Sequence, residues 1–201
     1  MTRILHTLLL LAPLAPALGT AAAPDSAAPS AVTTQPAAAE RALTALPGSG
    51  RLALLDGRAT RWLEQLGGGR WVLLKVWASD CPVCNHSITS LVEFAAHRSD
   101  PRLRLLGVAI DGYSNRRGVD NFIRRHRVNF PTLIDDGHAV DALYRAGTGM
   151  DWGGFTPTFL LFDPDGALVA KRIGPLRAES VLRFIDQREA GGTGGDEPRE
   201  D

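Results

Sequence analysis

The feature that most restricts the fold is a pair of cysteines placed just after an apolar run. Residues 71–77 read Trp-Val-Leu-Leu-Lys-Val-Trp, a composition that predicts a buried central strand. Cys81-Pro82-Val83-Cys84 follows this run, and apolar side chains at helical spacing then predict an amphipathic helix over 82–98. The two cysteines are therefore expected at the junction between a strand and a helix.

The rest of the core first repeats this alternation and then changes character. The pattern predicts a strand at 103–110, a helix around 119–123, a short extended piece at 132–134 and a helix around 140–144. Two strands at 158–162 and 167–173 are joined by the turn residues Asp-Pro-Asp-Gly, which predicts a hairpin, and a closing helix follows around 178–185. The order predicts an α/β fold with a mixed central sheet, built from βαβ units and a C-terminal ββα unit, with helices on both faces.

The two ends of the chain have compositions unlike the core. Residues 1–23 combine Arg3 with a short apolar run and small residues, which predicts a signal peptide cut between 19 and 23. A membrane-spanning helix needs about 20 apolar residues, so this run is too short to be one. Residues 24–47 are rich in Ala and Pro and predict a disordered linker, 48–189 one folded domain, and 190–201 a disordered tail. The formal net charge of zero gives no support for nucleic-acid binding.

The C-x-x-C spacing has a direct chemical meaning at the start of a helix. The unpaired N–H groups and the helix dipole favour an anion at Cys81, so its thiolate is a nucleophile for disulfides. Cys84 lies one turn later and can resolve the mixed disulfide, while Pro82 suits an early helical position. A zinc site would need a second ligand pair, which scattered histidines do not supply, and a structural disulfide of this size would stabilise little. Redox work is the preferred interpretation.

The segment from Val76 to Cys84 resembles the active-site segment of the TlpA/ResA-like thiol–disulfide oxidoreductases, a periplasmic group with the thioredoxin fold. Residues 50–69, 130–136 and 155–166 resemble other segments of that family, so the resemblance covers about 50–187. It implies a thioredoxin-like fold, and it implies that Pro157 is a cis-proline facing the cysteines. It also implies that the backbone of Thr156 pairs with an extended substrate, with Trp77 as a further substrate contact.

Three positions depart from the pattern of that family. Asp80 stands where an aromatic residue is common, and Lys75 stands where a buried carboxylate or amide is frequent. A carboxylate opposes the Cys81 thiolate and a cation favours it, so Lys75, Asp80 and Pro82 are candidates for tuning the Cys81 pKa. The alternatives are an exposed, screened Asp80 and a lysine whose ammonium group reaches solvent. Ser87 replaces the carboxylate that shuttles protons in relatives, and His86 is the neighbouring residue able to assist.

The loop at 145–155 is longer than the resemblance leads one to expect. Its glycines predict mobility, while Met150, Trp152 and Phe155 offer apolar contacts just before Thr156. The loop is therefore a candidate wall of a substrate groove, with a plain surface insertion as the alternative.

These observations predict an exported, periplasmic and monomeric oxidoreductase that reduces protein disulfides through Cys81 and Cys84. No metal and no dissociable cofactor is expected beyond the redox-active disulfide; electrons would come from a membrane or periplasmic redox protein. Cytochrome c maturation, through apocytochrome thiols, is one possible role that the resemblance implies. The alternatives are a disulfide oxidase or isomerase, and a copper chaperone for which His138 is a loose candidate ligand. A thiol peroxidase is weaker, because Ala78 stands where that class has a threonine.

Overall fold

The computed structural model describes residues 30–31, 52–66, 68–98 and 100–192. The predicted signal peptide, most of the predicted linker and the end of the predicted tail lie outside these residues. Within the described part of the chain, no helix combines the length and the apolar character needed to cross a membrane.

The sheet is mixed and has β3 (Trp71–Trp77) at its centre, buried along its whole length. The strand order is β1-β7-β6-β3-β4-β5-β2. β4 and β5 continue parallel to β3 on one side, whereas β6 and β7 form an antiparallel hairpin on the other. The remaining strands are β1 (Ser30–Ala31), β2 (Ala53–Leu54), β4 (Leu103–Ala109), β5 (Thr132–Ile134), β6 (Thr158–Phe162) and β7 (Leu168–Ile173).

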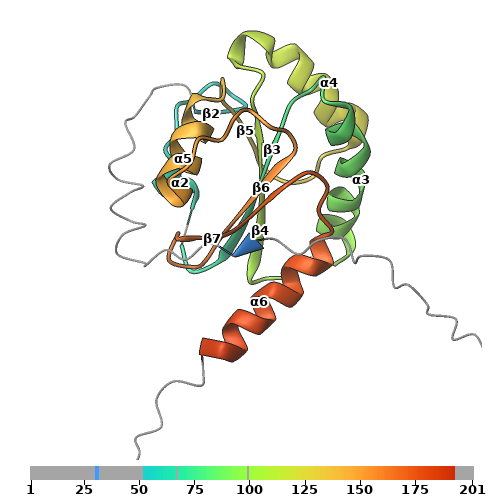
Figure 1. Ribbon diagram of the computed structural model, residues 1–201. Helices are drawn as coiled ribbons and strands as arrows, with labels where there is room; N and C mark the ends of the chain where they lie inside the picture. The colour runs from blue at the N-terminus through green and yellow to red at the C-terminus, as the bar shows by residue number, and fades with distance from the viewer. Residues whose placement is uncertain (1–29, 32–51, 67, 99, 193–201) are drawn as a thin grey trace, which may run out of the picture.

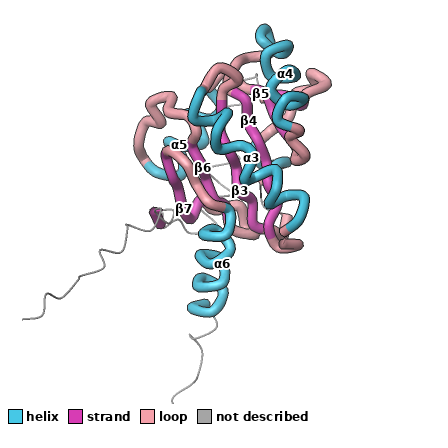
Figure 2. The backbone as a smooth tube through the Cα atoms, turned by 90° about the vertical axis from the view of Figure 1, so that its right-hand side faces the viewer, coloured by secondary structure: helices cyan, strands magenta, loops and turns pink. Residues whose placement is uncertain are grey.

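Helices cover both faces of this sheet (Figure 1). They are α2 (Trp62–Gln65), α3 (Pro82–His97), the 3-10 turn η1 (Tyr113–Asn115), α4 (Arg116–His126), α5 (His138–Thr148) and α6 (Ala178–Gly192). Figure 2, turned by 90°, brings α3 and α4 in front of the sheet. The C-terminal end of α6 extends below the sheet in both views.

The alternation along β3 divides the core in two. Leu73 and Trp77 pack with apolar side chains of α3, α4 and α6, whereas Val72, Leu74 and Val76 pack with those of α2 and α5. A strand buried on both faces needs apolar residues at nearly every position, which explains the continuous run in the sequence. Lys75 shares the face of Leu73 and Trp77, so its side chain enters the layer beneath α3 and α4.

The predicted fold class is confirmed, and each predicted strand and helix is present within a few residues of its expected bounds. Three short elements, β2, α2 and η1, were not predicted, because stretches of two to four residues show no usable periodicity. β1 lies within the predicted linker, where Ser30 pairs with Lys171 of β7. α6 ends at Gly192, beyond the predicted domain boundary at 189.

The parallel pairing of β3 and β4 determines where the cysteine motif sits. Trp77 is opposite Ala109 in the register, and the Ile110 amide donates to the Trp77 carbonyl at 2.9 Å. The carboxyl ends of both strands therefore lie side by side, and the loop to α3 leaves the sheet beside the loop to η1.

Candidate active site

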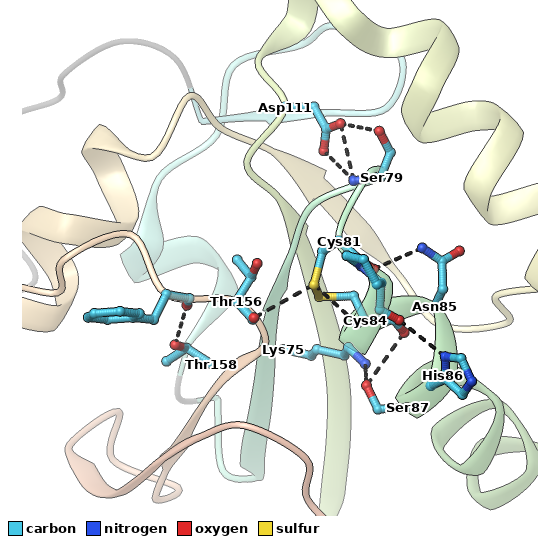
Figure 3. The surroundings of a disulfide bond; sticks show 12 residues. Lys75, Ser79, Cys81, Cys84, Asn85, His86, Ser87, Asp111, Thr156 and Thr158 are labelled. Carbon is cyan, nitrogen blue, oxygen red and sulfur yellow. Dashed lines mark hydrogen bonds between the residues drawn. A yellow bond between two sulfur atoms is a disulfide. The ribbon is translucent and has the colours of Figure 1, made fainter.

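Cys81 and Cys84 form a disulfide at the first turn of α3, with their Cα atoms 5.2 Å apart (Figure 3). Cys81 is the N-cap of the helix, and its Sγ accepts a hydrogen bond from the Cys84 amide at 3.1 Å. Pro82 occupies the first helical position, where its missing N–H costs nothing. Cys81 is partly exposed whereas Cys84 is fully buried. The accessible sulfur thus sits at the positive end of the helix dipole, which stabilises a thiolate there.

The Thr156 backbone faces this sulfur from the other side. The Thr156 carbonyl oxygen lies 3.6 Å from Cys81 Sγ, and the Thr156–Pro157 peptide bond is cis. The buried Thr158 anchors the segment, because its hydroxyl donates to the Phe155 carbonyl at 2.6 Å and accepts from Trp152 Nε1 at 3.0 Å. The Thr156 backbone therefore borders Cys81 Sγ, which is the position that the resemblance implies for it.

Asp111, just past β4, holds the loop that leads into the cysteine motif. The Ser79 amide donates to both carboxylate oxygens, at 3.2 and 3.1 Å, and the Ser79 hydroxyl donates to Oδ1. Asp111 was not among the residues predicted for the site. Its position could have been predicted: Asp111 follows a strand parallel to β3, so it is expected at the same edge of the sheet as the cysteine motif.

Asn85 connects the start of α3 with the end of α4. Its Nδ2 donates to the Cys81 carbonyl at 2.8 Å, and its Oδ1 accepts from His126 Nε2, also at 2.8 Å. The imidazole packs on Phe122, which in turn stacks on Trp77. Burial, and then the charges of Arg125 and Lys75, lower the pKa of His126. This link was not predicted either, because His126 is distant in sequence and the direction of its side chain depends on how α4 packs.

Lys75 lies beneath the cysteine motif and is only 1% exposed. Its Nζ donates to Ser87 Oγ at 3.1 Å, and burial lowers its pKa to about 7. The alternative in which the ammonium group reaches solvent does not fit this burial. Ser87, which stands where relatives have a carboxylate, is thus the hydrogen-bond partner of a buried amine.

A model of the AhpC/TSA family matches residues 51–171, which is more than half of the chain. The chain belongs to the AhpC/TSA family. The thiol-disulfide oxidoreductase ResA of Bacillus cereus is 25% identical over 119 residues, covering 59% of this chain and 64% of ResA. The sporulation thiol-disulfide oxidoreductase A of Bacillus subtilis is 25% identical over 120 residues, covering 59% of this chain and 68% of that protein. The chain spans about two thirds of the length of these curated relatives.

Solved structures of similar shape identify the fold. The crystal structure of StoA from Bacillus subtilis matches with a TM-score of 0.53 at 20% identity, over 67% of this chain and 94% of StoA. The exposed lipoprotein thioredoxin Etrx1 of Streptococcus pneumoniae matches with a TM-score of 0.53 at 24% identity, over 68% of this chain and 97% of Etrx1. At this identity the matches show the fold alone, and they confirm the predicted thioredoxin-like fold.

Not every predicted site residue of this AhpC/TSA-family chain reaches the place expected of it. Trp77 does not fit the predicted role of a substrate contact, because its side chain is 0% exposed and lies under Phe122. Asp80 and Pro82 are exposed beside Cys81. His86 is exposed as well, with Nδ1 3.4 Å from the Pro82 carbonyl oxygen.

The loop before Thr156 is shorter than predicted, because α5 continues to Thr148. Trp152 belongs to the core, whereas Met150 and Phe155 are exposed. Of the three apolar residues predicted as groove contacts, Trp152 is therefore a structural residue.

A hollow of about 470 Å³ lies on the other side of Asp111. Its lining residues include Leu52, Gly57, Ile110, Asp136 and, from η1, Tyr113. Asp111, which holds the Ser79 loop, also lines this hollow.

Among the described residues, no group of three or more His, Cys, Asp or Glu side chains is arranged to hold a metal ion. His138, the candidate ligand of the copper alternative, is exposed at the first position of α5.

Proposed function

We propose that this protein is an exported thiol–disulfide oxidoreductase that reduces disulfide bonds in protein substrates. One observation carries the proposal: the sulfur of the partly exposed Cys81 lies at the N-terminus of α3, bonded to the buried Cys84 and facing the Thr156 carbonyl. This arrangement gives one sulfur for attack on a substrate and a second sulfur within reach to finish the exchange.

The reaction proceeds in two exchanges from the dithiol form. The Cys81 thiolate attacks one sulfur of a substrate disulfide; the S–Cys81 bond forms, the substrate S–S bond breaks, and one substrate thiolate leaves. The Cys84 thiolate then attacks Cys81 Sγ and releases the second substrate thiolate. The substrate gains two electrons and two protons, and the protein ends as the Cys81–Cys84 disulfide.

The family relatives support this class of activity, because ResA and the sporulation protein both carry the name thiol-disulfide oxidoreductase. The substrate contacts are proposed from this chain's own surface. Val83 and Phe155 are 45% and 59% exposed, and they adjoin Cys84 and Thr156 in the chain. An extended substrate segment that pairs with the Thr156 backbone would cover both side chains.

Three parts of the proposal are argued from the sequence: export, the direction of electron flow and the redox partners. Arg3 and the apolar run after it support an exported, periplasmic protein. The TlpA/ResA-like resemblance favours reduction, with apocytochrome c thiols as one substrate class. Electrons would come from a membrane or periplasmic dithiol protein, with no dissociable cofactor, and the protein would work as a monomer.

The test is the reduction potential of the Cys81–Cys84 couple, followed by tryptophan fluorescence in dithiothreitol or glutathione buffers. We expect a value near or below about −270 mV, like thioredoxin, for a reductase. A value near about −120 mV would assign the same cysteines to an oxidant or isomerase instead.

A second experiment tests the order of attack. Cys84→Ser should accumulate a mixed disulfide between Cys81 and a disulfide-containing peptide, whereas Cys81→Ser should not. Equal accumulation by both variants would overturn the assignment of Cys81 as the attacking residue.

A further inference from the structure

Lys75 is a buried ionisable residue close to the cysteines. It lies in the middle of β3, on the face of the sheet that α3 and α4 cover, and is 1% exposed. Figure 3 shows its amine end directed toward the first turns of α3, below the cysteine pair. Burial of a long cationic side chain without a counter-ion is costly, so its position calls for an explanation.

The partners of the amine are neutral in this disulfide form. Nζ donates to Ser87 Oγ at 3.1 Å and lies 5.4 Å from the centre of the Phe159 ring. The Ser87 hydroxyl donates onward to the Cys84 carbonyl at 3.4 Å, which ties the amine to the turn that carries the buried sulfur. In the described part of the chain, no carboxylate forms an ion pair with Lys75.

The titratable groups around this amine are few and come from two helices. α3 contributes Cys81 and Cys84, which Figure 3 draws above the amine, and α4 contributes His126, whose pKa is lowered by burial and then by the charges of Arg125 and Lys75. The neighbouring strands place Gly107 and Phe159 opposite Lys75, and neither residue titrates. Once the disulfide is reduced, the anion that can form closest to the amine is therefore a cysteine thiolate.

Burial explains why the amine responds to that event. With no anion beside it, burial lowers the pKa of Lys75 to about 7. At neutral pH a large fraction of the protein therefore has Lys75 as the neutral amine. A thiolate at Cys84 would supply the missing counter-ion and favour the ammonium form. The same pairing favours the thiolate at a fully buried sulfur, which burial alone would oppose.

We propose that Lys75 holds one of the two protons taken up on reduction, as a neutral amine beside the disulfide and as an ammonium paired with the Cys84 thiolate in the dithiol form. The inference rests on the proposed oxidoreductase function and gives Lys75 a role as a positioning residue for the resolving sulfur. A dithiol donor and the Cys81–Cys84 disulfide yield the donor disulfide, the Cys81 thiol, the Cys84 thiolate and the Lys75 ammonium. Both donor protons are accounted for, one on Cys81 and one on Lys75. Cys81 gives its proton to solvent when it attacks a substrate as the thiolate.

The pairing also serves the return step. The Cys84 thiolate attacks Cys81 Sγ in the mixed disulfide without first losing a proton to solvent. The substrate thiolate that leaves is protonated from solvent, and Lys75 returns one proton to solvent as its counter-ion is consumed. The dithiol form is thereby stabilised, which makes the couple less reducing than it would be without Lys75.

The chain allows a direct test, because it contains two lysines, Lys75 and Lys171. Lysine labelled with ¹³C at Cε gives two NMR signals in the full chain, and Lys75→Met assigns them. We expect the Lys75 signal to titrate near pH 7 in the disulfide form and more than one pH unit higher in the dithiol form. The Lys171 signal is the internal reference: its amine, on β7, donates to the Tyr144 hydroxyl of α5, so it should not respond to the redox state of the cysteines. Equal midpoints for Lys75 in the two forms would overturn the proposal.

Redox equilibria provide a second and independent readout. At pH 8, the equilibrium constant for reduction of the Cys81–Cys84 disulfide by dithiothreitol should be at least tenfold larger for wild type than for Lys75→Met. The ratio should shrink as the pH falls below 7, because Lys75 then already carries a proton in the disulfide form. Lys171→Met, the matched control, should stay within twofold of wild type at each pH. A ratio independent of pH would contradict the proposal.

These outcomes are separable from the fate of the proposed function. If wild type fails to reduce protein disulfides, the function is wrong, yet the lysine titration still decides the role of Lys75. If the substrate is reduced and Lys75 titrates alike in both forms, only the proton-holding role falls.

Discussion

Asp111 and Ser79 connect the ends of the two central parallel strands. The carboxylate accepts the Ser79 amide through both oxygens, at 3.2 and 3.1 Å, and it accepts the Ser79 hydroxyl as well. Asn115 Nδ2 donates to the same carboxylate at 3.2 Å, so the start of α4 is held too. Cys81 follows Ser79 by two residues, and its position relative to Thr156 therefore depends on a carboxylate from the loop that follows β4.

We predict that Asp111→Ala lowers both stability and reactivity. Loss of the acceptor leaves the Ser79 amide without its partner, which should reduce the free energy of unfolding by about 1–3 kcal/mol. Displacement of Cys81 should slow its reaction with a peptide disulfide on the order of tenfold. Urea unfolding and stopped-flow kinetics measure the two effects. Glu93→Ala, which removes an exposed carboxylate of α3 outside the cysteine motif, is the control; an equal loss in both variants would contradict the role of Asp111.

The sequence predicted what depends on local pattern. The apolar run of β3, the turn residues before β7 and the position of Cys81 at the start of α3 each follow from residues close together in the chain. The cysteine pair itself could therefore be selected, with its chemistry, before the fold was known.

What the sequence left open depends on packing between distant elements. An apolar run with one lysine fits both a buried amine and one that reaches solvent, and the covering α3 decides between them at Lys75. Trp77 was assigned to the substrate, but α4 places Phe122 on its ring at 4.2 Å between centroids. His126 meets Asn85 only because α3 and α4 pack side by side.

We predict that Asn85→Asp raises the pKa of His126. The substitution places a carboxylate where Oδ1 now accepts from Nε2 at 2.8 Å, and an adjacent anion stabilises the imidazolium. The expected rise is about one to three pKa units, measured by NMR titration of the imidazole Cε1–H. Asn121→Asp, on the exposed side of α4, should change it much less. An unmoved His126 in Asn85→Asp would mean that the contact between α3 and α4 does not form in solution.

We predict that Phe155→Ser weakens substrate binding and leaves the chemical step unchanged. Phe155 is 59% exposed and directly precedes Thr156, so a substrate paired with that backbone covers an apolar ring. Loss of this contact should raise KM about threefold to tenfold with little change in kcat, in an assay of protein-disulfide reduction. As the control, Leu63→Ser removes an exposed apolar side chain, 46% exposed, from α2, which packs on the face of the sheet opposite α3. A similar KM for wild type and Phe155→Ser would exclude the loop from the substrate path.

The buried amine of Lys75 should make the stability of the disulfide form depend on pH. Burial lowers the pKa of Lys75 from 10.5 to about 7, so between these values the unfolded chain binds a proton that the native protein does not. Stability from this group therefore rises with pH across that window. Below pH 7 Lys75 is protonated in both the native and the unfolded protein. There it lowers the free energy of unfolding by its full amount, about 5 kcal/mol.

We predict that Lys75→Met stabilises the oxidised protein, and does so most at low pH. Because methionine carries no charge, the gain over wild type should be about 3 kcal/mol larger at pH 6.5 than at pH 9.5. Guanidinium unfolding of the disulfide forms at the two pH values measures this difference, with no reductant present. Lys171→Met is the matched control, because its amine meets the Tyr144 hydroxyl on a partly exposed part of β7 and should show no comparable pH dependence. A gain that is the same at both pH values would mean that the amine keeps its proton throughout, and that some group outside this pocket compensates its charge.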